Sequence, residues 1–379
     1  MKILVLNVGS STCKCWYQDA PDGKIQTART EWKSSERGED KISALLESLP
    51  FLGAVEIVGH RIVHGGPKYR DSVFVTPEVR AAIAQQAEFA PAHNRLQLAA
   101  IETIERLVGD KIPQVAVFDT AFHRTLAPAA YVYPGPYAWL EQGIRRYGFH
   151  GISVQYATRR AAELLQKPRQ ALRLIVCHLG NGASVTAVAH GKSVDTSMGF
   201  TPLEGIMMGT RSGSIDPSIP AYLLRHGTSA EDLDSILNRQ SGLLGISGFS
   251  GDMREILEAI ERGNERAKLA YDIYAHRLTR EVGAMLAVLG GVDAIVFTGG
   301  IGENCAPLRR DVCAQLEFLG LRLDAAKNAQ RAVDQNIAAG DSAVQVLVIR
   351  ADEDWEIARE CRRMAAAQES ISPATTSST

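Results

Sequence analysis

The strongest constraint on the fold is a pattern that occurs three times, a short apolar run that ends in glycine and small polar residues. Ile3–Leu6 leads into NVGSST, Leu174–Val176 into CHLGNGAS, and Ala294–Phe297 into TGGIGEN. Each run predicts a buried strand that feeds a tight turn. The first two are separated by about half the chain, and both place glycine beside hydroxyl and amide side chains. This pattern predicts two similar halves, each presenting a turn to a shared cleft.

The rest of the chain mixes helical and strand periodicity. Apolar residues with helical spacing predict helices at Pro77–Glu88, Arg95–Leu107, Ser153–Leu165, Ser229–Asn238 and Ala267–Leu289. Further strands are expected at Val115–Phe118, Ser184–Ala189 and Val344–Ile349. The mixture favours α/β layers, and a chain of 379 residues favours two domains of about 150 to 200 residues each. The small, polar segment 368–379 predicts a disordered tail.

Charge and hydrophobicity exclude several classes of protein. The formal net charge is −2, so there is no large basic field to hold nucleic acid or anionic lipid. The apolar start is too brief for a signal peptide, and no apolar stretch reaches 18 residues. The six cysteines form no C-x-x-C pair, which favours reduced thiols. We therefore expect a cytoplasmic protein whose partner is a small molecule, with neither nucleic acid nor membrane involved.

The residue types at the first turn suit phosphate chemistry. Phosphoryl transfer requires hydroxyls and backbone N–H groups around the phosphates, a carboxylate-held Mg²⁺, and cations over the transferring group. The segment from Asn7 to Lys14 offers an amide, a glycine, three hydroxyls and a lysine. It does not match G-x-x-x-x-G-K-[ST], so a P-loop is excluded.

Two arginines have small or glycine neighbours. Arg61 lies in GHRIVHGG and Arg211 in GTRSG, where small flanks allow a guanidinium to approach a ligand closely. Arginine matches carboxylate and phosphate oxygens in a bidentate fork. The alternative is that both are ordinary surface arginines.

Histidines and carboxylates complete the set of candidates. Histidines stand in polar or glycine-containing loops, where they are either structural residues or hydrogen-bond donors to phosphoryl oxygens; they are His93, His123, His150 and His178. A carboxylate substrate is already ionised at neutral pH, so a general base is not needed. Asp119, directly after a predicted strand, is the stronger candidate for Mg²⁺, and Glu353 in RADED is the second.

Taken together, these segments resemble the acetate kinase family, which has the actin-like ATPase (ribonuclease H-like) superfold. The resemblance covers nearly the whole chain in the family's order, through NVGSS, GHRIVHGG, FDTAFH, YGFHG, HLGNGAS, DTSMGFTPLEG, GTRSG and TGGIGEN. It implies an α/β fold of two similar domains around a central cleft. Residues 1–147 with a C-terminal helix at about 353–367 would form the acid and phosphate domain, and residues 148–352 the nucleotide-binding domain. It further implies a homodimer.

The resemblance also implies an activity and residue roles. The activity is reversible, direct in-line transfer of the γ-phosphoryl group of ATP to acetate, giving acyl phosphate and ADP. Arg61 and Arg211 would hold the acid and the transferring group, and His150 and Asn181 would stabilise the transition state. Asp119 and Glu353 would serve Mg²⁺ (or Mn²⁺), near Asn7. Supporting residues are Ser10, Thr12 and His93. The nucleotide would be bound by Lys14, His178, Gly180, Asn181, Gly182, Asp252, Arg254, Gly299, Gly300, Ile301 and Asn304.

The sequence departs from the family's pattern in ways that bear on substrate and rate. Ser214 stands where the family usually has aspartate, and the G-T-S-H and A-P-L-H-N-P-P-N segments are altered, so we expect lower turnover. The acid's methyl group would sit among Val63, Ala92, Phe149 and Pro202. Because alanine replaces the family's leucine at Ala92, we hypothesise tolerance for propionate or another short-chain acid. A sugar kinase would need a carboxylate base, and a non-enzymatic actin- or Hsp70-like module would not need the arginine pair.

Overall fold

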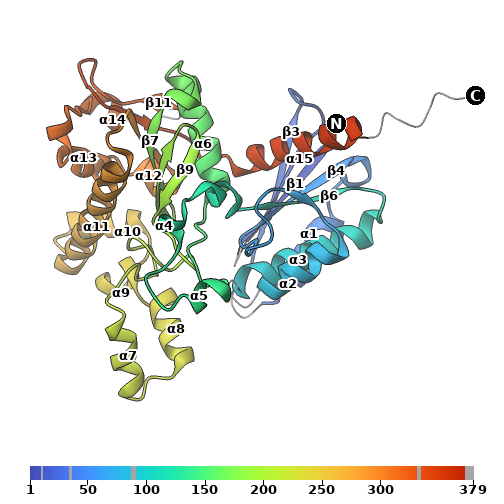
Figure 1. The fold of residues 1–379 in the computed structure, drawn as a ribbon, viewed down its shortest axis with the longest axis horizontal. Coiled ribbons are helices and arrows are strands. Elements are labelled where there is room, and N and C mark those ends of the chain that lie inside the picture. The colour runs from blue at the N-terminus through green and yellow to red at the C-terminus, as the bar shows by residue number, and fades with distance from the viewer. Residues whose placement is uncertain (10–11, 34–35, 87–90, 331–333, 372–379) are drawn as a thin grey trace, which may run out of the picture. The chain divides into compact units, whose positions relative to one another are not determined.

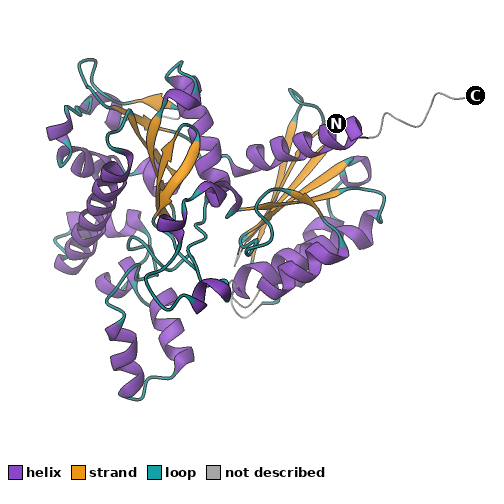
Figure 2. Cartoon of the chain, viewed as in Figure 1, coloured by secondary structure: helices purple, strands orange, loops and turns teal. Residues whose placement is uncertain are grey.

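Two compact units make up the chain in the computed structural model, which describes residues 1–9, 12–33, 36–86, 91–330 and 334–371, without the side chains of residues 91–93 and 371. Unit 1 comprises Met1–Phe122 and Asp352–Thr379, and unit 2 comprises His123–Ala351 (Figure 1). Each unit contains one six-stranded sheet with helices packed on it (Figure 2). None of the helices in the described part of the chain is long and apolar enough to cross a lipid bilayer.

The sheet of unit 1 has the order β3-β2-β1-β4-β6-β5. Its strands are β1 (Ile3–Val8), β2 (Thr12–Gln18), β3 (Ile25–Glu31), β4 (Ile57–Ile62), β5 (Val73–Phe74) and β6 (Gln114–Phe118). The first three strands form an antiparallel meander, β1, β4 and β6 are parallel, and β5 closes the edge antiparallel to β6. The helices of this unit are α1 (Gly38–Glu47), η1 (Leu52–Ala54), α2 (Pro77–Gln85), α3 (Pro91–Val108) and α15 (Glu353–Ile371).

The sheet of unit 2 repeats this topology in the order β9-β8-β7-β10-β12-β11. Its strands are β7 (Arg173–Leu179), β8 (Ala183–Ala189), β9 (Lys192–Thr196), β10 (Ala294–Thr298), β11 (Gln335–Asn336) and β12 (Gln345–Val348). Strands β7 to β9 form the antiparallel meander, β7, β10 and β12 are parallel, and β11 is antiparallel to β12. The predicted two similar halves are therefore confirmed, and the antiparallel pair β1–β2 is equivalent to the pair β7–β8.

Unit 2 carries more helical additions than unit 1. Its helices are η3 (Ala121–Thr125, which starts at the end of unit 1), α4 (Pro128–Tyr131), α5 (Ala138–Glu141), α6 (Gly151–Leu164), η4 (Arg169–Ala171), α7 (Ser218–Arg225), α8 (Ala230–Arg239), α9 (Gly242–Ser247), α10 (Met253–Glu261), α11 (Glu265–Leu289), α12 (Gly299–Asn304), α13 (Ala306–Ala314), η5 (Glu317–Leu319) and α14 (Ala325–Ala329). Figure 1 shows α11 on one side of the sheet and α6 on the other, and both contact β7. All five predicted helices and all the predicted strands are present, with ends shifted by a few residues.

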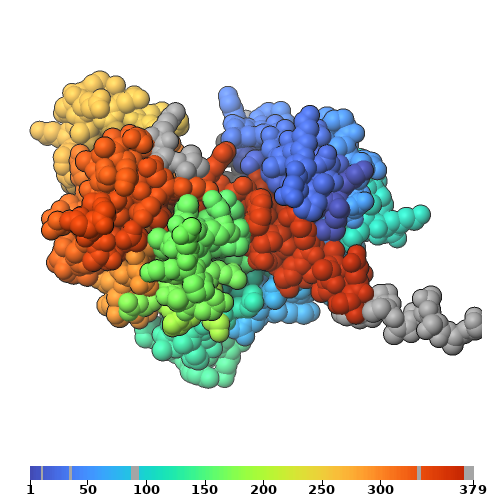
Figure 3. All heavy atoms as spheres, turned by 90° about the horizontal axis from the view of Figure 1, so that it is seen from above, coloured from blue at the N-terminus to red at the C-terminus, as the bar shows by residue number. Residues whose placement is uncertain are grey.

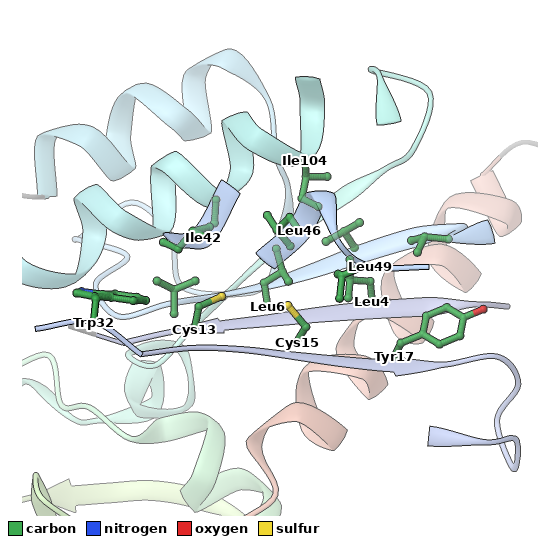
Figure 4. Packing of buried hydrophobic residues seen from close by; sticks show 14 residues of the cluster. Leu4, Leu6, Cys13, Cys15, Tyr17, Trp32, Ile42, Leu46, Leu49 and Ile104 are labelled. Atoms are coloured by element: carbon green, nitrogen blue, oxygen red, sulfur yellow. The ribbon is translucent and has the colours of Figure 1, made fainter. Parts of the chain in front are cut away.

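Opposite faces of the unit 1 sheet bury different helices. On one face, the apolar side chains of β1 and β2 pack against Ile42, Leu46 and Ile104 of α1 and α3 (Figure 4). On the other face, a Cβ added at Gly59 would lie only 2.6 Å from Ile357 of α15. Side chains alternate between the two faces of a strand, so Gly59 lets the helix approach the sheet backbone. The space-filling view in Figure 3 shows α15, in red, against the blue N-terminal strands.

The C-terminal helix shows an exchange between the units. Helix α15 follows β12 of unit 2 in the sequence but packs on β1, β4 and β6 of unit 1. Helix α6 follows the last strand of unit 1 but packs on β7 and β10 of unit 2. Each sheet is therefore covered on one face by a helix that follows the other unit's last strand.

Two predicted boundaries differ from the structure. The units divide after Phe122, earlier than the expected residue 147, because His123 and Arg146 bond to residues of unit 2: His123 to Ser193, and Arg146 to the Thr196 carbonyl. The C-terminal helix continues to Ile371, beyond the expected end at residue 367, so part of the expected disordered tail is helical. Residues 372–379 of that tail lie outside the described residues. All six cysteines lie among the described residues, where they are free and buried.

Candidate active site

In unit 1, polar side chains converge at the ends of β1, β4 and β6 and at the first turn of α15. Arg61 on β4 donates to both oxygens of Asp119, with its shortest contact, Nη2 to Oδ2, at 2.7 Å. Its Nη1 donates to Asn7 Oδ1 at 3.1 Å and lies 3.3 Å from Glu353 Oε2. Asn7 Nδ2 in turn donates to Glu353 Oε2 at 3.0 Å. The structure thus brings together four predicted residues from distant parts of the sequence.

A fifth predicted residue, Lys14 on β2, forms an ion pair with Asp354. Asp354 also accepts from Asn7 Nδ2 at 3.5 Å, and its side chain is only 4% exposed. Sequence reasoning assigned no role to Asp354. The acidic run RADED was the available signal, but nothing local in the sequence indicates that Asp354 is buried against β1 and β2.

The electrostatics of this cluster favour binding of a further cation. Burial raises the pKa of Asp119 to about 6 against the attraction of Arg61, and the neighbouring Glu353 carboxylate adds to the rise. Burial opposes the charge on Arg61, but attraction to Asp119 and Glu353 raises its pKa. Burial also raises the pKa of Asp354 against the attraction of Lys14. Three carboxylates therefore face two cations, and an additional positive charge would balance them.

Other predicted residues of unit 1 lie nearby or outside the described set. Thr12 begins β2 and Val63 is buried directly after β4, where its N–H donates to Gln97 Oε1 at 3.0 Å. Gln97 Nε2 donates to the Val8 carbonyl at 3.0 Å, so this buried amide, which sequence reasoning did not assign, links the ends of β1 and β4. The predicted site residues outside the described residues are Ser10 and the side chains of Ala92 and His93.

In unit 2, two histidines lie side by side near the turn after β7. The rings of His150 and His178 are 4.2 Å apart between centroids. His150 Nδ1 is 3.0 Å from Ser184 Oγ, and His178 Nδ1 is 2.7 Å from Ser153 Oγ. His150 has φ of 57° at the start of α6, so it is held in a left-handed conformation. Each Nδ1 is occupied by a hydroxyl, which fixes the orientation of both rings.

Arg211 approaches the same turn from a later loop. A Cβ added at Gly182 would lie 3.2 Å from Arg211 Nη1 and 3.3 Å from His150 Nε2, so both side chains point toward this glycine. The Gly209 N–H donates to the Asn181 carbonyl at 3.1 Å and joins the loop of Arg211 to the turn. The structure therefore brings together His150, Asn181 and Arg211, three of the residues predicted to act on the transferring group.

Arg211 has an unusual set of partners for a partly buried cation. Its Nη1 donates to the Pro202 carbonyl at 3.3 Å and lies 3.7 Å from Met208 Sδ. Among the described residues, no carboxylate forms an ion pair with it, and burial lowers its pKa. An uncompensated guanidinium in a low-dielectric setting attracts an anion strongly. Phe149, which is buried, directly precedes His150 in the chain.

Unit 2 also holds a cavity of about 470 Å³ between the turn after β7, the start of α10 and helix α12. Predicted nucleotide-binding residues that line it are Gly180, Asn181, Asp252, Arg254, Gly300, Ile301 and Asn304. The lining also includes residues that sequence reasoning did not assign, namely Gly251, Met253, Leu257 and Cys305. The remaining predicted nucleotide-binding residues of unit 2 do not line the cavity; they are His178, Gly182 and Gly299. Apolar walls with a few polar groups are typical of a site for a small molecule.

The ends of the cavity are built by backbone turns. Gly299 has φ of +79°, and a Cβ there would lie 2.9 Å from the Leu179 carbonyl oxygen, so only glycine fits between β10 and α12. The Gly299 N–H donates to Glu303 Oε1 at 3.0 Å. At the other end Asp252 caps α10 by accepting from the Arg254 N–H at 2.8 Å, and its carboxylate pairs with the Arg254 guanidinium.

Comparison with known proteins identifies the family. The sequence profile of the Acetokinase family matches residues 22–359. The chain belongs to this family. The acetate kinase of Gloeobacter violaceus is 52% identical in an alignment that covers 95% of this chain and 98% of that protein. The acetate kinase of Nostoc punctiforme is 51% identical with the same coverage.

Solved structures agree with the sequence comparison. The crystal structure of Porphyromonas gingivalis acetate kinase superimposes with a TM-score of 0.86 at 38% identity, covering 96% of this chain and 99% of that chain. A propionate kinase from Francisella tularensis gives a TM-score of 0.85 at 37% identity with the same coverage. The Acetokinase family consists of phosphate-transferring kinases, and this member is an enzyme of that class.

In this member of the Acetokinase family, Ser214 has a definite structural role. Its Oγ accepts from the Gly205 N–H at 3.0 Å, and its own N–H donates to the Gly205 carbonyl at 2.8 Å. This hydroxyl therefore accepts a backbone hydrogen bond, as a carboxylate could, but it adds no negative charge beside the loop that carries Arg211.

Proposed function

We propose that the chain transfers the γ-phosphoryl group of ATP directly and reversibly to the carboxylate of acetate. The observation that carries this proposal is Arg211, a partly buried cation that forms no ion pair with a carboxylate within the described ranges and points to the same glycine as His150. The acetate kinases at 52% and 51% identity support acetate as the acceptor.

The residues of unit 2 stabilise the charge that moves. Arg211 binds the oxygens of the transferring phosphoryl group, and His150 Nε2 donates a hydrogen bond to the same group while Ser184 fixes its ring. Asn181 belongs to the turn after β7 and lines the cavity, where ADP or ATP is bound between α10 and α12. Because the donors are held in place before the substrate arrives, they stabilise developing charge without reorganisation.

The residues of unit 1 suit a divalent cation, Mg²⁺ or Mn²⁺. Glu353 and Asp119, supported by Asn7, would hold it, and the three-to-two excess of carboxylates over cations favours it. No group of three or more metal-ligating side chains occurs among the described residues. Mg²⁺ is usually bound by one or two carboxylates together with substrate phosphates and water, and Glu353 and Asp119 supply two carboxylates. The ion would neutralise phosphate charge, and Arg61 would bind the acid or the transferring group.

The acceptor needs no general base in this chemistry. Its carboxylate is ionised at neutral pH, so the residues only orient it and shield the phosphoryl group from water. We propose that Val63 and Ala92 of unit 1 contact the methyl group of the acid. Propionate is the second candidate substrate, favoured by alanine at residue 92 and by the likeness to a propionate kinase.

We further propose a cytoplasmic homodimer. Helix α7 supports the dimer because none of its residues is buried, and Ile219, Tyr222 and Leu224 are 46%, 53% and 46% exposed. A helix with so much exposed apolar surface is typical of an interface.

The decisive experiment is trapping of acyl phosphate with hydroxylamine. Purified protein is incubated with ATP, Mg²⁺ and acetate, propionate or butyrate, and kcat/KM is measured for each acid. Arg211→Ala serves as the control for contaminating kinase. Formation of acyl hydroxamate that disappears in Arg211→Ala supports the proposal. ATP hydrolysis without hydroxamate for any of the three acids would reject it, and an optimum at propionate would favour the second substrate.

A further inference from the structure

One arginine of unit 2 with no role in the proposed chemistry bonds to four groups at once. The Nη1 of Arg146 lies within hydrogen-bonding distance of the carbonyls of Thr196, Ser197 and Met198, at 2.9, 3.0 and 3.0 Å. Its Nη2 donates to Glu204 Oε1 at 2.6 Å. The Arg146 side chain is 17% exposed. These acceptors all lie in the first half of the segment 196–214, which we name the arginine loop because it carries Arg211.

The backbone next to Arg146 leads directly to other site residues. The N–H groups of Tyr147 and Gly148 donate to the Gly199 carbonyl at 3.0 and 3.3 Å. Phe149 and His150 follow immediately in the sequence. Arg146 is therefore the point at which the segment that carries His150 is joined to the arginine loop.

Tyr133 forms further hydrogen bonds to the arginine loop. Tyr133 donates to Glu204 Oε2, and its oxygen accepts from the Phe200 N–H at 2.8 Å. A Cβ at Gly199 would overlap both Tyr133 and Glu204, so this residue must be glycine for the loop to pack here. Glu204 is thus held from two sides and gives Arg146 a fixed acceptor.

The far end of the arginine loop is closed in a similar way. Gly205 and Ser214 exchange two hydrogen bonds, and Arg277 of α11 donates to the Ser214 carbonyl at 2.8 Å. Between these fixed ends, the Pro202 carbonyl accepts from Arg211 Nη1. The position of Arg211 therefore depends on a loop whose beginning is fixed by Arg146.

We propose that Arg146 is a positioning residue that sets the place of Arg211 and Pro202 relative to His150. This inference rests on the proposed function, because it assigns Arg146 an effect on phosphoryl transfer without contact with the substrate. A planar guanidinium can satisfy several carbonyls and a carboxylate at fixed angles, whereas an ammonium group is a compact point charge without that fork. Catalysis is sensitive to such placement, since a misplacement of about 1 Å can cost about 100-fold in rate.

The test compares Arg146→Ala and Arg146→Lys with Arg160→Ala as the matched control. Arg160 is also a partly buried arginine of unit 2, but it lies on α6, and within the described part of the chain its ion pairs are with Asp334, at 2.8 Å, and Glu163. For each protein, kcat and KM for the acid, KM for ATP and Tm are measured. Amide hydrogen exchange of residues 196–214 is followed by mass spectrometry in the absence of substrate.

We expect Arg146→Ala to lower kcat/KM for the acid by about 100-fold, with KM for ATP changed less than about threefold, and to speed exchange in the arginine loop. Arg146→Lys should have a kcat/KM for the acid about tenfold higher than that of Arg146→Ala. Arg160→Ala should leave activity and loop exchange unchanged. Amide exchange in Arg146→Ala like that of the unaltered protein would overturn the inference. So would a rise in KM for ATP as large as the loss in kcat/KM for the acid, together with a lower Tm. The exchange result can be read even if the protein forms no acyl phosphate, so failure of the proposed function would be recognised separately.

Discussion

Arg61 and Arg211 are both partly buried arginines of the proposed site, but the structure predicts opposite effects on stability when each is replaced by methionine. Arg61 is bonded to Asp119, Asn7 and Glu353, whereas the Arg211 guanidinium donates only to a carbonyl and a sulfur among the described residues. We expect Arg61→Met to destabilise the protein and Arg211→Met to stabilise it. Both variants should lose nearly all activity.

The magnitudes follow from the contacts. Removing one partner of a buried ion pair costs about 3–5 kcal/mol, because the remaining charge stays buried. Here Asp119, which is 1% exposed, would lose all its bonds from Arg61, so we expect a loss in the free energy of unfolding of about 3 kcal/mol or more. Arg211→Met removes a charge whose burial is not offset by an ion pair, and methionine keeps much of the side-chain volume. A gain of about 1–2 kcal/mol is expected, since Arg211 is only partly buried.

The assay is urea unfolding without substrate, followed by fluorescence and circular dichroism to detect a separate transition of each unit. Inorganic phosphate is then added as an anion that can pair with Arg211. Saturation at about 100 times its Kd should stabilise the unaltered protein by about 2.7 kcal/mol and leave Arg211→Met unchanged.

Two results would refute this reasoning. One is destabilisation of more than about 1 kcal/mol in Arg211→Met, which would mean that the guanidinium contributes to stability through its carbonyl contact alone. The other is an Arg61→Met variant as stable as the unaltered protein, which would mean that Asp119 is satisfied without its ion pair.

Three further predictions concern pH, substrate and packing. Burial lowers the pKa of His123 to about 4, so the neutral imidazole contributes fully to stability above about pH 6.5. Up to about 3 kcal/mol of the free energy of unfolding is lost as pH falls toward 4, and unfolding titrations of His123→Gln should show a shallower acid dependence. Ala92→Leu should raise the ratio of kcat/KM for acetate to kcat/KM for propionate about fourfold, because one buried CH₂ contributes about 0.8 kcal/mol. Gly59→Ala would push its new methyl group against Ile357 and lower the free energy of unfolding by about 1–3 kcal/mol in urea titrations.

The sequence was most informative where function depends on local patterns. The apolar runs at the starts of β1, β7 and β10 predicted the strands, and the turn expected after β7 is present at residues 180–182. The tight turn expected after β10 was wrong, because Gly299–Asn304 form the short helix α12. The pairing of Arg61 with Asp119 was not predicted as a contact, although each residue was a candidate by itself. The order of parallel strands brings their ends together, and that order is set by long-range packing that periodicity does not reveal.

Other features could not be found from local patterns. Asp354 reads as one more acidic residue at a helix start, and only the return of α15 to unit 1 buries it beside Lys14. Arg146 stands beside Arg145 in a short RR run, and nothing in that run shows which arginine bonds to the carbonyls of the arginine loop. The boundary after Phe122 was also missed, because the segment up to Arg146 lacks strong periodicity and is assigned by its contacts.

The exchanged position of α15 has a consequence for the order of events during protein synthesis. Domains generally fold as units while the chain emerges from the ribosome, with N-terminal domains first. Here the strands of unit 1 emerge early, but the helix that covers one face of their sheet is made last, after the whole of unit 2. Until then Gly59 and its neighbours on that face stay uncovered, and the acidic residues at the start of α15 are missing from the site. The unit translated first is thus the one completed last, and the nascent chain depends on unit 2 being finished before Arg61 meets Glu353.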